Sequence, residues 1–129
     1  IRLKIGVLGV KTFPKGTYIY VGSALNSLEA RIKRCEKTNF GSNTKIYWHI
    51  DYLLRNSEAQ IREVWYKETD KRKECLIAEE VLTRGSPLLG FGCTDCQCVS
   101  HLFSVEETMF LEALGLRFWK EKLYDSAPP

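Results

Sequence analysis

The sequence lacks several patterns that define large classes of protein. No apolar run is long enough to span a lipid bilayer, so we expect no membrane partner. No G-x-G-x-x-G motif opens a helix, which argues against a dinucleotide-binding fold. The chain also shows no secretory-signal pattern, no internal repeat and no low-complexity tract apart from its Ser-Ala-Pro-Pro end. These absences favour a small globular protein.

The cysteines do not fit a disulfide framework. The chain has five cysteines, an odd number, and three of them lie within the six residues 93–98. This spacing suits free or metal-bound thiols in a reducing compartment better than paired disulfides. We therefore expect a cytoplasmic protein.

Length and composition are those of one compact domain. The 129 residues can enclose one hydrophobic core, and the apolar content of 44% is ordinary for a globular protein. We expect a single domain over residues 1–125 and a disordered tail at 126–129. The net charge of +3 is compatible with a nucleic-acid partner but does not identify one.

The most informative local pattern is a strand followed by a helix. Residues 17–21 are rich in β-branched and aromatic side chains, which is typical of a strand. Gly22 then permits a tight turn. Asn26 and Glu29 have the spacing of a capping box, which predicts the start of a helix.

Two arginines lie on one face of this predicted helix. Arg31 and Arg34 are three residues apart and therefore neighbours on the helix surface. The strand before them delivers Tyr20 and Gly22 to the helix N-terminus. Helix N-termini and guanidinium groups both favour phosphate, so the pattern predicts a phosphate-binding site.

These residues resemble the second half of the GIY-YIG nuclease signature. In that family, Y-I-G ends a strand and an arginine follows on the next helix, as Tyr20-Val21-Gly22 and Arg31 do here. The segments YIYVGSA, WHIDYLL and FGCTDCQCVSHLF are similar to a mostly archaeal subgroup, usually labelled a domain of unknown function. The resemblance covers roughly residues 5–105.

The resemblance implies both a fold and a reaction. The fold is α/β (α+β), with a small, mainly antiparallel sheet of three to four strands flanked by helices. The reaction is metal-dependent hydrolysis of a nucleic-acid phosphodiester. Tyr20 would be a general base or a hydrogen-bond donor, Arg31 would stabilise the developing charge, and Glu74 would bind Mg²⁺ or Mn²⁺. The alternative for Glu74 is a solvated surface glutamate.

The chain departs from the family pattern at two positions. The family's first motif, G-I-Y, is expected on a strand just before Ile1. Tyr18 could substitute for its tyrosine, but strand alternation puts Tyr18 and Tyr20 on the same face. Cys35 stands where the family usually has a histidine. A thiol is a poorer general base than an imidazole near neutral pH.

A second hypothesis is a nucleic-acid-binding module that does not cut. Arg31, Lys33, Arg34 and Lys37 would then contact phosphates, and binding would depend steeply on salt. In either case we expect DNA rather than RNA as the partner. Dimerisation could cover an unpaired edge strand.

His49 has two interpretations. It lies on a predicted helix at 46–55. In the first interpretation the imidazole satisfies a buried hydrogen bond, as buried polar groups generally do. In the second it faces the cleft and contacts a phosphate or a catalytic water.

The cysteine-rich segment supports a third hypothesis, a structural or zinc-binding protein. Cys93, Cys96, Cys98 and His101 could hold Zn²⁺ tetrahedrally. The alternative is a packed loop of free thiols, which behave as small hydrophobic groups.

The remaining patterns predict the other elements. Residues 3–9 and 17–22 predict an antiparallel hairpin, and Ser104 with Glu107 predicts a capped helix that ends near residue 114. The other expected elements are a central strand at 59–67, a helix at 71–84, a Gly/Pro loop at 85–92 and an added strand within 116–125.

Overall fold

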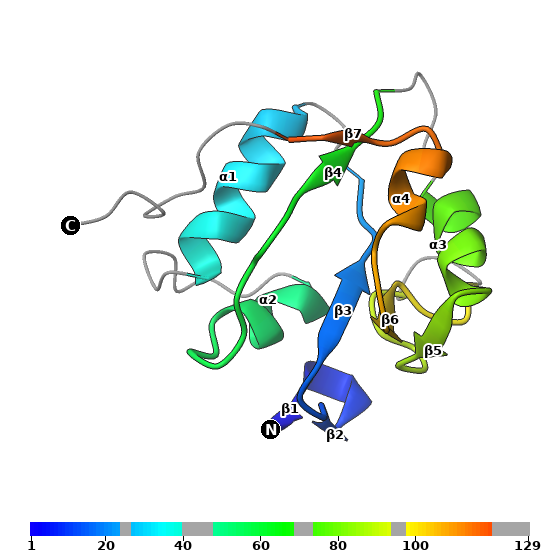
Figure 1. The fold of residues 1–129 in the computed structure, drawn as a ribbon. Helices are drawn as coiled ribbons and strands as arrows, with labels where there is room; N and C mark the ends of the chain where they lie inside the picture. Colours follow the sequence, from blue (N-terminus) through cyan, green and yellow to red (C-terminus); the bar gives the residue numbers. More distant parts are fainter. Residues whose placement is uncertain (24–26, 40–47, 69–73, 94–97, 120–129) are drawn as a thin grey trace.

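The computed structural model describes residues 1–23, 27–39, 48–68, 74–93 and 98–119. It confirms the predicted α+β class, with helices around small antiparallel sheets (Figure 1). The elements in chain order are β1 (Arg2–Lys4), the 3-10 helix η1 (Gly6–Leu8), β2 (Val10–Thr12), β3 (Thr17–Tyr20), α1 (Leu28–Asn39), α2 (His49–Leu54), β4 (Trp65–Tyr66), α3 (Glu74–Leu82), β5 (Gly85–Pro87), β6 (Leu102–Val105), α4 (Phe110–Ala113) and β7 (Arg117–Phe118). The predicted cap at Asn26, the predicted ligand Cys96 and the predicted tail at 126–129 lie outside the described residues.

The central sheet has three strands in the order β3-β6-β5, with β6 in the middle. Both neighbours run antiparallel to β6. In this register Thr17 lies opposite Val105 and Tyr20 lies opposite Leu102. The end of β3 is therefore level with the beginning of β6, and this edge of the sheet carries the candidate site.

Each face of this sheet is covered by its own core. Because side chains alternate along a strand, Tyr18 and Tyr20 pack on one face and Ile19 and Val21 on the other. Helices α1 and α2 lie on one side of the sheet, and α3 and α4 on the other (Figure 1). The α2-side core consists of the buried residues Ile5, Phe13, Ile50, Leu53, Leu54, Phe91 and Leu102. The α3-side core consists of Val21, Ala78, Val81, Phe103, Val105, Phe110, Leu111 and Leu116.

The N-terminal segment does not pair with β3, so the predicted hairpin is wrong. Instead, β1 pairs with β2, and Arg2 lies opposite Thr12. The reason lies in Gly6 and Gly9, whose φ angles of 48° and 78° fold the segment back on itself through η1. Such angles are readily available to glycine and interrupt a continuous strand.

The predicted helix that starts at Ser104 is also wrong in its first half. Ser104 pairs with Tyr18 on one side and Ser86 on the other, so the residue belongs to the central strand β6. Glu107 still acts near a helix start, because its carboxylate accepts a hydrogen bond from the Met109 N–H just before α4. Pairing on both edges of β6 outweighs the local capping pattern. The predicted loop at 85–92 likewise begins with β5.

The predicted central strand at 59–67 is a short strand of a separate sheet. Only β4 is regular there, and it pairs with β7, which confirms an added strand near the C-terminal end. Asn39 holds the preceding segment, since its amide donates to the carbonyl oxygens of Leu54 and Ala59 and accepts from the Ile61 N–H. None of the helices in the described part of the chain has the length and hydrophobicity that a membrane crossing requires.

Candidate active site

The end of β3 places a tyrosine against an arginine of α1. Nη2 of Arg31 donates to the Tyr20 hydroxyl at 3.3 Å, and Nη1 donates to the Ser23 carbonyl oxygen at 3.2 Å. Gly22 allows this approach, since a Cβ atom there would lie 3.0 Å from the Tyr20 ring and 3.4 Å from Nη2. The structure thus brings together three residues that the sequence pattern singled out.

Tyr20 is a neutral phenol near neutral pH. Burial raises its pKa above the usual value of 10, while the Arg31 guanidinium lowers it in part. Because the net shift is upward, Tyr20 is poorly suited to act as a general base. With Arg31 donating to its oxygen, the phenol is suited to donate its own proton in a hydrogen bond.

Trp48 and Asp51 organise the arginine face of α1. The Trp48 ring lies against both guanidinium groups, with its centroid 3.9 Å from Cζ of Arg31 and 4.3 Å from Cζ of Arg34. Arg34 also makes two hydrogen bonds to the fully buried Asp51, at 2.8 Å and 3.0 Å. Asp51 in turn accepts from the Trp48 N–H at 2.9 Å. Arg34, which was predicted to contact nucleic acid, therefore supports the position of α2.

His49 is the first residue of α2, and its imidazole makes a hydrogen bond within the protein, as in the first of its two interpretations. Its Nδ1 accepts a hydrogen bond from the Gly92 N–H at 2.8 Å, and its ring packs edge-on against Phe91 with centroids 5.6 Å apart. Desolvation lowers its pKa, so the ring is neutral near pH 7. Because Nδ1 is the acceptor, the proton of this neutral ring lies on Nε2.

The partial desolvation of His49 predicts a loss of stability on acidification. The folded state binds a proton at His49 less readily than the unfolded state does. The stability is therefore fully present above the unfolded pKa of about 6.5 and decreases as the pH falls below it. We expect His49→Asn, whose amide oxygen can still accept from Gly92, to flatten this dependence. Urea unfolding from about pH 8 to about pH 5 would test it, and parallel curves for the two proteins would contradict it.

Phe91 is the residue that the site needs and that sequence reasoning did not single out. It is fully buried, and its ring packs edge-on against those of Phe13, Tyr20 and His49. The distance between ring centroids is 6.4 Å to Phe13 and 6.3 Å to Tyr20. Its neighbour Gly92 supplies the N–H that holds His49. The available signal was its position at the start of the FGC motif.

The other predicted residues of β3 and α1 make contacts outside the pair of Tyr20 and Arg31. Tyr18 shares a face with Tyr20, but its hydroxyl donates to the Pro14 carbonyl oxygen at 2.6 Å in the preceding turn. Cys35 packs on the α2-side core, and burial raises the pKa of its thiol, so the thiol is poorly suited to act as a general base near neutral pH. Lys33 and Lys37 are exposed on α1, and Lys33 pairs with Glu29 at 2.7 Å.

Glu74 is the first residue of α3. Its side chain is partly buried, and its Oε2 atom is shielded from solvent, so it is not a fully solvated surface glutamate. A carboxylate oxygen is the ligand type that Mg²⁺ and Mn²⁺ prefer, and Mg²⁺ is commonly held by one or two carboxylates together with water. The donor chemistry of Glu74 therefore fits the metal that the family resemblance implies.

A second set of ligand-type side chains lies beside the first. The potential ligand atoms of Cys75, Cys98 and His101 all lie within 4.8 Å of one another. Two of these residues belong to the predicted zinc set, whereas Cys75 comes from α3 and was not predicted. Cys93 is not part of this cluster, and its thiol donates to the Phe91 carbonyl oxygen at 3.4 Å. The cluster could hold a metal ion.

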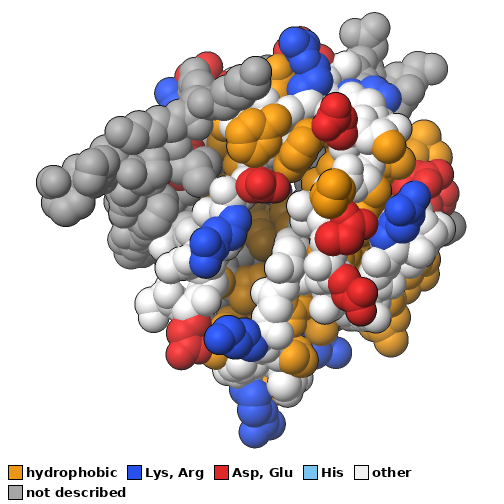
Figure 2. Space-filling view, viewed as in Figure 1, with side chains coloured by type: hydrophobic (Ala, Val, Ile, Leu, Met, Phe, Trp, Pro, Cys, Tyr) orange, Lys and Arg blue, Asp and Glu red, His pale blue; other side chains and the backbone are white. Residues whose placement is uncertain are grey.

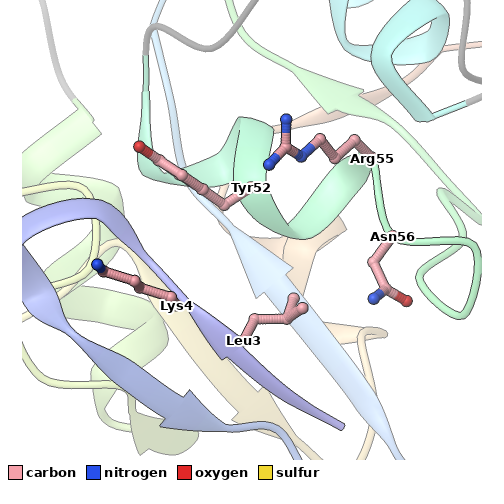
Figure 3. A pocket seen from close by; sticks show the side chains of 5 residues that line it. All are labelled: Leu3, Lys4, Tyr52, Arg55 and Asn56. Carbon is pink, nitrogen blue, oxygen red and sulfur yellow. The ribbon is translucent and has the colours of Figure 1, made fainter. Parts of the chain in front are cut away.

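A cationic pocket lies at the other end of α2. Its volume is about 350 Å³, and it is lined by Leu3, Lys4, Tyr52, Arg55 and Asn56 (Figure 3). The Arg55 guanidinium carbon is 5.8 Å from the centroid of the Tyr52 ring. None of the described residues that line it is acidic, so the pocket suits an anionic group. On the face seen in Figure 2, by contrast, the described Lys and Arg side chains are interspersed with Asp and Glu.

Comparison with known proteins places the chain in a family. No curated protein matches the chain, and no solved structure matches it. A family model described as "Domain of unknown function DUF123" matches residues 1–121, which is most of the chain. The chain therefore belongs to the DUF123 family.

Proposed function

We propose that this chain is a metal-dependent nucleic-acid phosphodiesterase of the GIY-YIG type, centred on Tyr20 and Arg31. The contact between these two side chains at the end of β3 is the observation that carries the proposal. It joins a planar cation to a phenol beside Gly22, where the absence of a side chain leaves room for both groups. The order Tyr-x-Gly followed by an arginine on the next helix is also the order of the GIY-YIG nuclease motif.

In this proposal each residue of the site has a separate role in phosphodiester hydrolysis. Water would attack phosphorus in line with the leaving oxygen. Arg31 would stabilise the charge that develops on the phosphate oxygens, because a fixed guanidinium costs little reorganisation. The Tyr20 hydroxyl and the Nε2–H of His49 would donate hydrogen bonds that orient the phosphate or the water. Glu74 would bind the divalent metal, which supplies Lewis-acid stabilisation of the phosphate.

A non-cutting nucleic-acid-binding module is the second candidate. One observation favours it. Cys35 stands where the GIY-YIG family usually has a histidine, and burial raises the pKa of its thiol. Neither Tyr20 nor His49 supplies a ready base, because the Tyr20 pKa is raised and Nδ1 of His49 already accepts from Gly92. Such a chain would use the same phosphate contacts for binding alone.

Parallel binding and cleavage assays separate the two candidates. The wild-type chain would be mixed with labelled branched, duplex and single-stranded DNA, with Mg²⁺, with Mn²⁺ or with EDTA. The nuclease proposal expects cleavage that EDTA abolishes. Binding that weakens steeply with salt, without cleavage under any metal condition, would support the binding module instead. If the chain neither binds nor cleaves DNA, both candidate functions are contradicted.

The exposed lysines of α1 predict a change in salt dependence. Each phosphate contact on duplex DNA contributes about 0.9 to the slope of log K against log salt, so Lys37→Ala is expected to lower the slope by about that amount. Lys33→Ala is the matched comparison. Because Lys33 already pairs with Glu29, we expect it to lower the slope less. Equal slopes for wild type and Lys37→Ala would exclude Lys37 from the DNA contact.

A further inference from the structure

We propose that Cys75, Cys98 and His101 form a zinc site that joins α3 to the central sheet. The three residues come from different parts of the fold. Cys75 lies in the first turn of α3, Cys98 precedes β6, and His101 is the last residue before that strand. Their ligand atoms lie within 4.8 Å of one another. A single ion would therefore connect segments that are more than twenty residues apart along the chain.

The spacing of the ligand atoms fits tetrahedral zinc. With zinc bonds of about 2.3 Å to sulfur and about 2.0 Å to nitrogen, a tetrahedral angle separates sulfur from nitrogen by about 3.5 Å. The Sγ atom of Cys75 lies 3.9 Å from Nε2 of His101. Binding would require these two side chains to move by only a few tenths of an ångström. Three protein ligands leave the fourth position for water or a further ligand.

The surroundings of His101 direct its Nε2 atom toward the Cys75 thiol. Nδ1 lies 3.0 Å from the Val21 carbonyl oxygen, which can only accept a hydrogen bond, so Nδ1 carries the proton. The lone pair of Nε2 then faces Cys75. Hydrogen bonds of this kind, from the other ring nitrogen to a backbone carbonyl, are typical of histidines that bind metals. Two backbone hydrogen bonds, to Phe91 and from Val21, fix the position of this buried residue.

The ligand set selects the class of metal. Two thiolates and an imidazole suit zinc and disfavour Mg²⁺, which prefers oxygen ligands. The site is therefore different in chemistry from the carboxylate of Glu74, although Glu74 is the residue before Cys75. Cys98 also lines a cavity of about 110 Å³ between α3 and β6. Zinc binding at this site does not require nuclease activity.

Metal content tests the proposal directly. The full chain would be purified in reducing buffer without chelator, and its metals would be measured. We expect about one zinc per chain, retained in Cys93→Ser and in the control Cys35→Ser, and lost in Cys75→Ser and Cys98→Ser. A zinc-free wild-type protein that also fails to take up added zinc would overturn the proposal. So would loss of zinc from Cys93→Ser together with retention in Cys75→Ser, because the ligands would then lie elsewhere.

A second measurement avoids substitutions, in case the variants do not fold. The wild-type protein would be treated with a thiol-alkylating reagent before and after zinc is removed with a chelator, and the labelled cysteines would be identified by mass spectrometry. We expect Cys75 and Cys98 to be protected with zinc bound and labelled after its removal, with little change at Cys93. Equal labelling of Cys75 and Cys98 in both states would overturn the proposal.

Discussion

Replacing Asp51 with alanine is expected to lower the free energy of unfolding by about 3–5 kcal/mol, because it leaves one partner of a buried ion pair alone. Asp51 is fully buried and accepts two hydrogen bonds from Arg34 and one from the Trp48 N–H. The variant would lose all three and leave the Arg34 guanidinium with only partial access to water. Urea denaturation of the two proteins side by side would measure the difference.

Two further variants assign the effect to the ion pair. Asp51→Asn keeps an oxygen that can accept from Trp48, so we expect a smaller loss than for alanine. The double variant Arg34→Ala/Asp51→Ala is expected to be less destabilised than the sum of its single variants, because it leaves no unpaired charge. A loss below about 1 kcal/mol for Asp51→Ala would mean that the pair contributes no more than a surface salt bridge.

Replacing Arg31 with alanine is expected to reduce DNA cleavage by about 10²–10³-fold, the usual effect of removing one group that stabilises transition-state charge. The stability cost should be modest, since the lost contacts are two hydrogen bonds and the stacking on Trp48. Cleavage rates under single-turnover conditions, compared with urea unfolding of the same samples, would separate the two effects.

Arg31→Lys and Arg84→Ala are the informative companions of this variant. Lysine has one side-chain nitrogen and cannot reproduce the planar pair of contacts to Tyr20 and Ser23. We therefore expect Arg31→Lys to recover little of the activity. Arg84 is exposed and lies over Phe110 on the other side of the sheet, and its replacement removes the same charge. If Arg84→Ala reduces cleavage as much as Arg31→Ala does, the effect comes from net charge and not from the site.

The parts of the site that could be predicted are formed by residues close to one another in the sequence. Tyr20, Gly22 and Arg31 lie within twelve residues of one another, and the strand and helix that carry them have strong local patterns. Alternation along β3 correctly places Tyr18 and Tyr20 on one face. Local chemistry is sufficient here because the long-range pairing of β3 with β6 agrees with the local strand pattern.

The errors arise where distant segments compete with local patterns. Ser104 and Glu107 have the spacing of a capping box, but β3 and β5 both pair with this segment and draw it into the sheet. Conversely, residues 3–9 have a strand pattern, yet two glycines turn them back before they reach β3. Strand pairing depends on partners that can be far away in the sequence, so spacing alone does not identify them.

The metal cluster shows the same limit at the level of the site. Cys98 and His101 are three residues apart and could be grouped from the sequence. Cys75 lies on a helix, 23 residues before Cys98 (98 − 75), with no local pattern that marks it as a ligand. Only the packing of α3 beside β5 and β6 brings its thiol to His101.

The metal dependence of DNA cleavage, measured for the wild-type chain and for Glu74→Gln, tests the proposed phosphodiesterase most directly. Glutamine keeps the shape of the side chain but removes the charge that attracts a divalent cation. We expect the wild type to cut labelled DNA in the presence of Mg²⁺ or Mn²⁺, and Glu74→Gln to need a much higher metal concentration or to fail. A folded wild-type chain that binds DNA but does not cut it at any metal concentration would contradict the account, as would equal metal dependence in the two proteins.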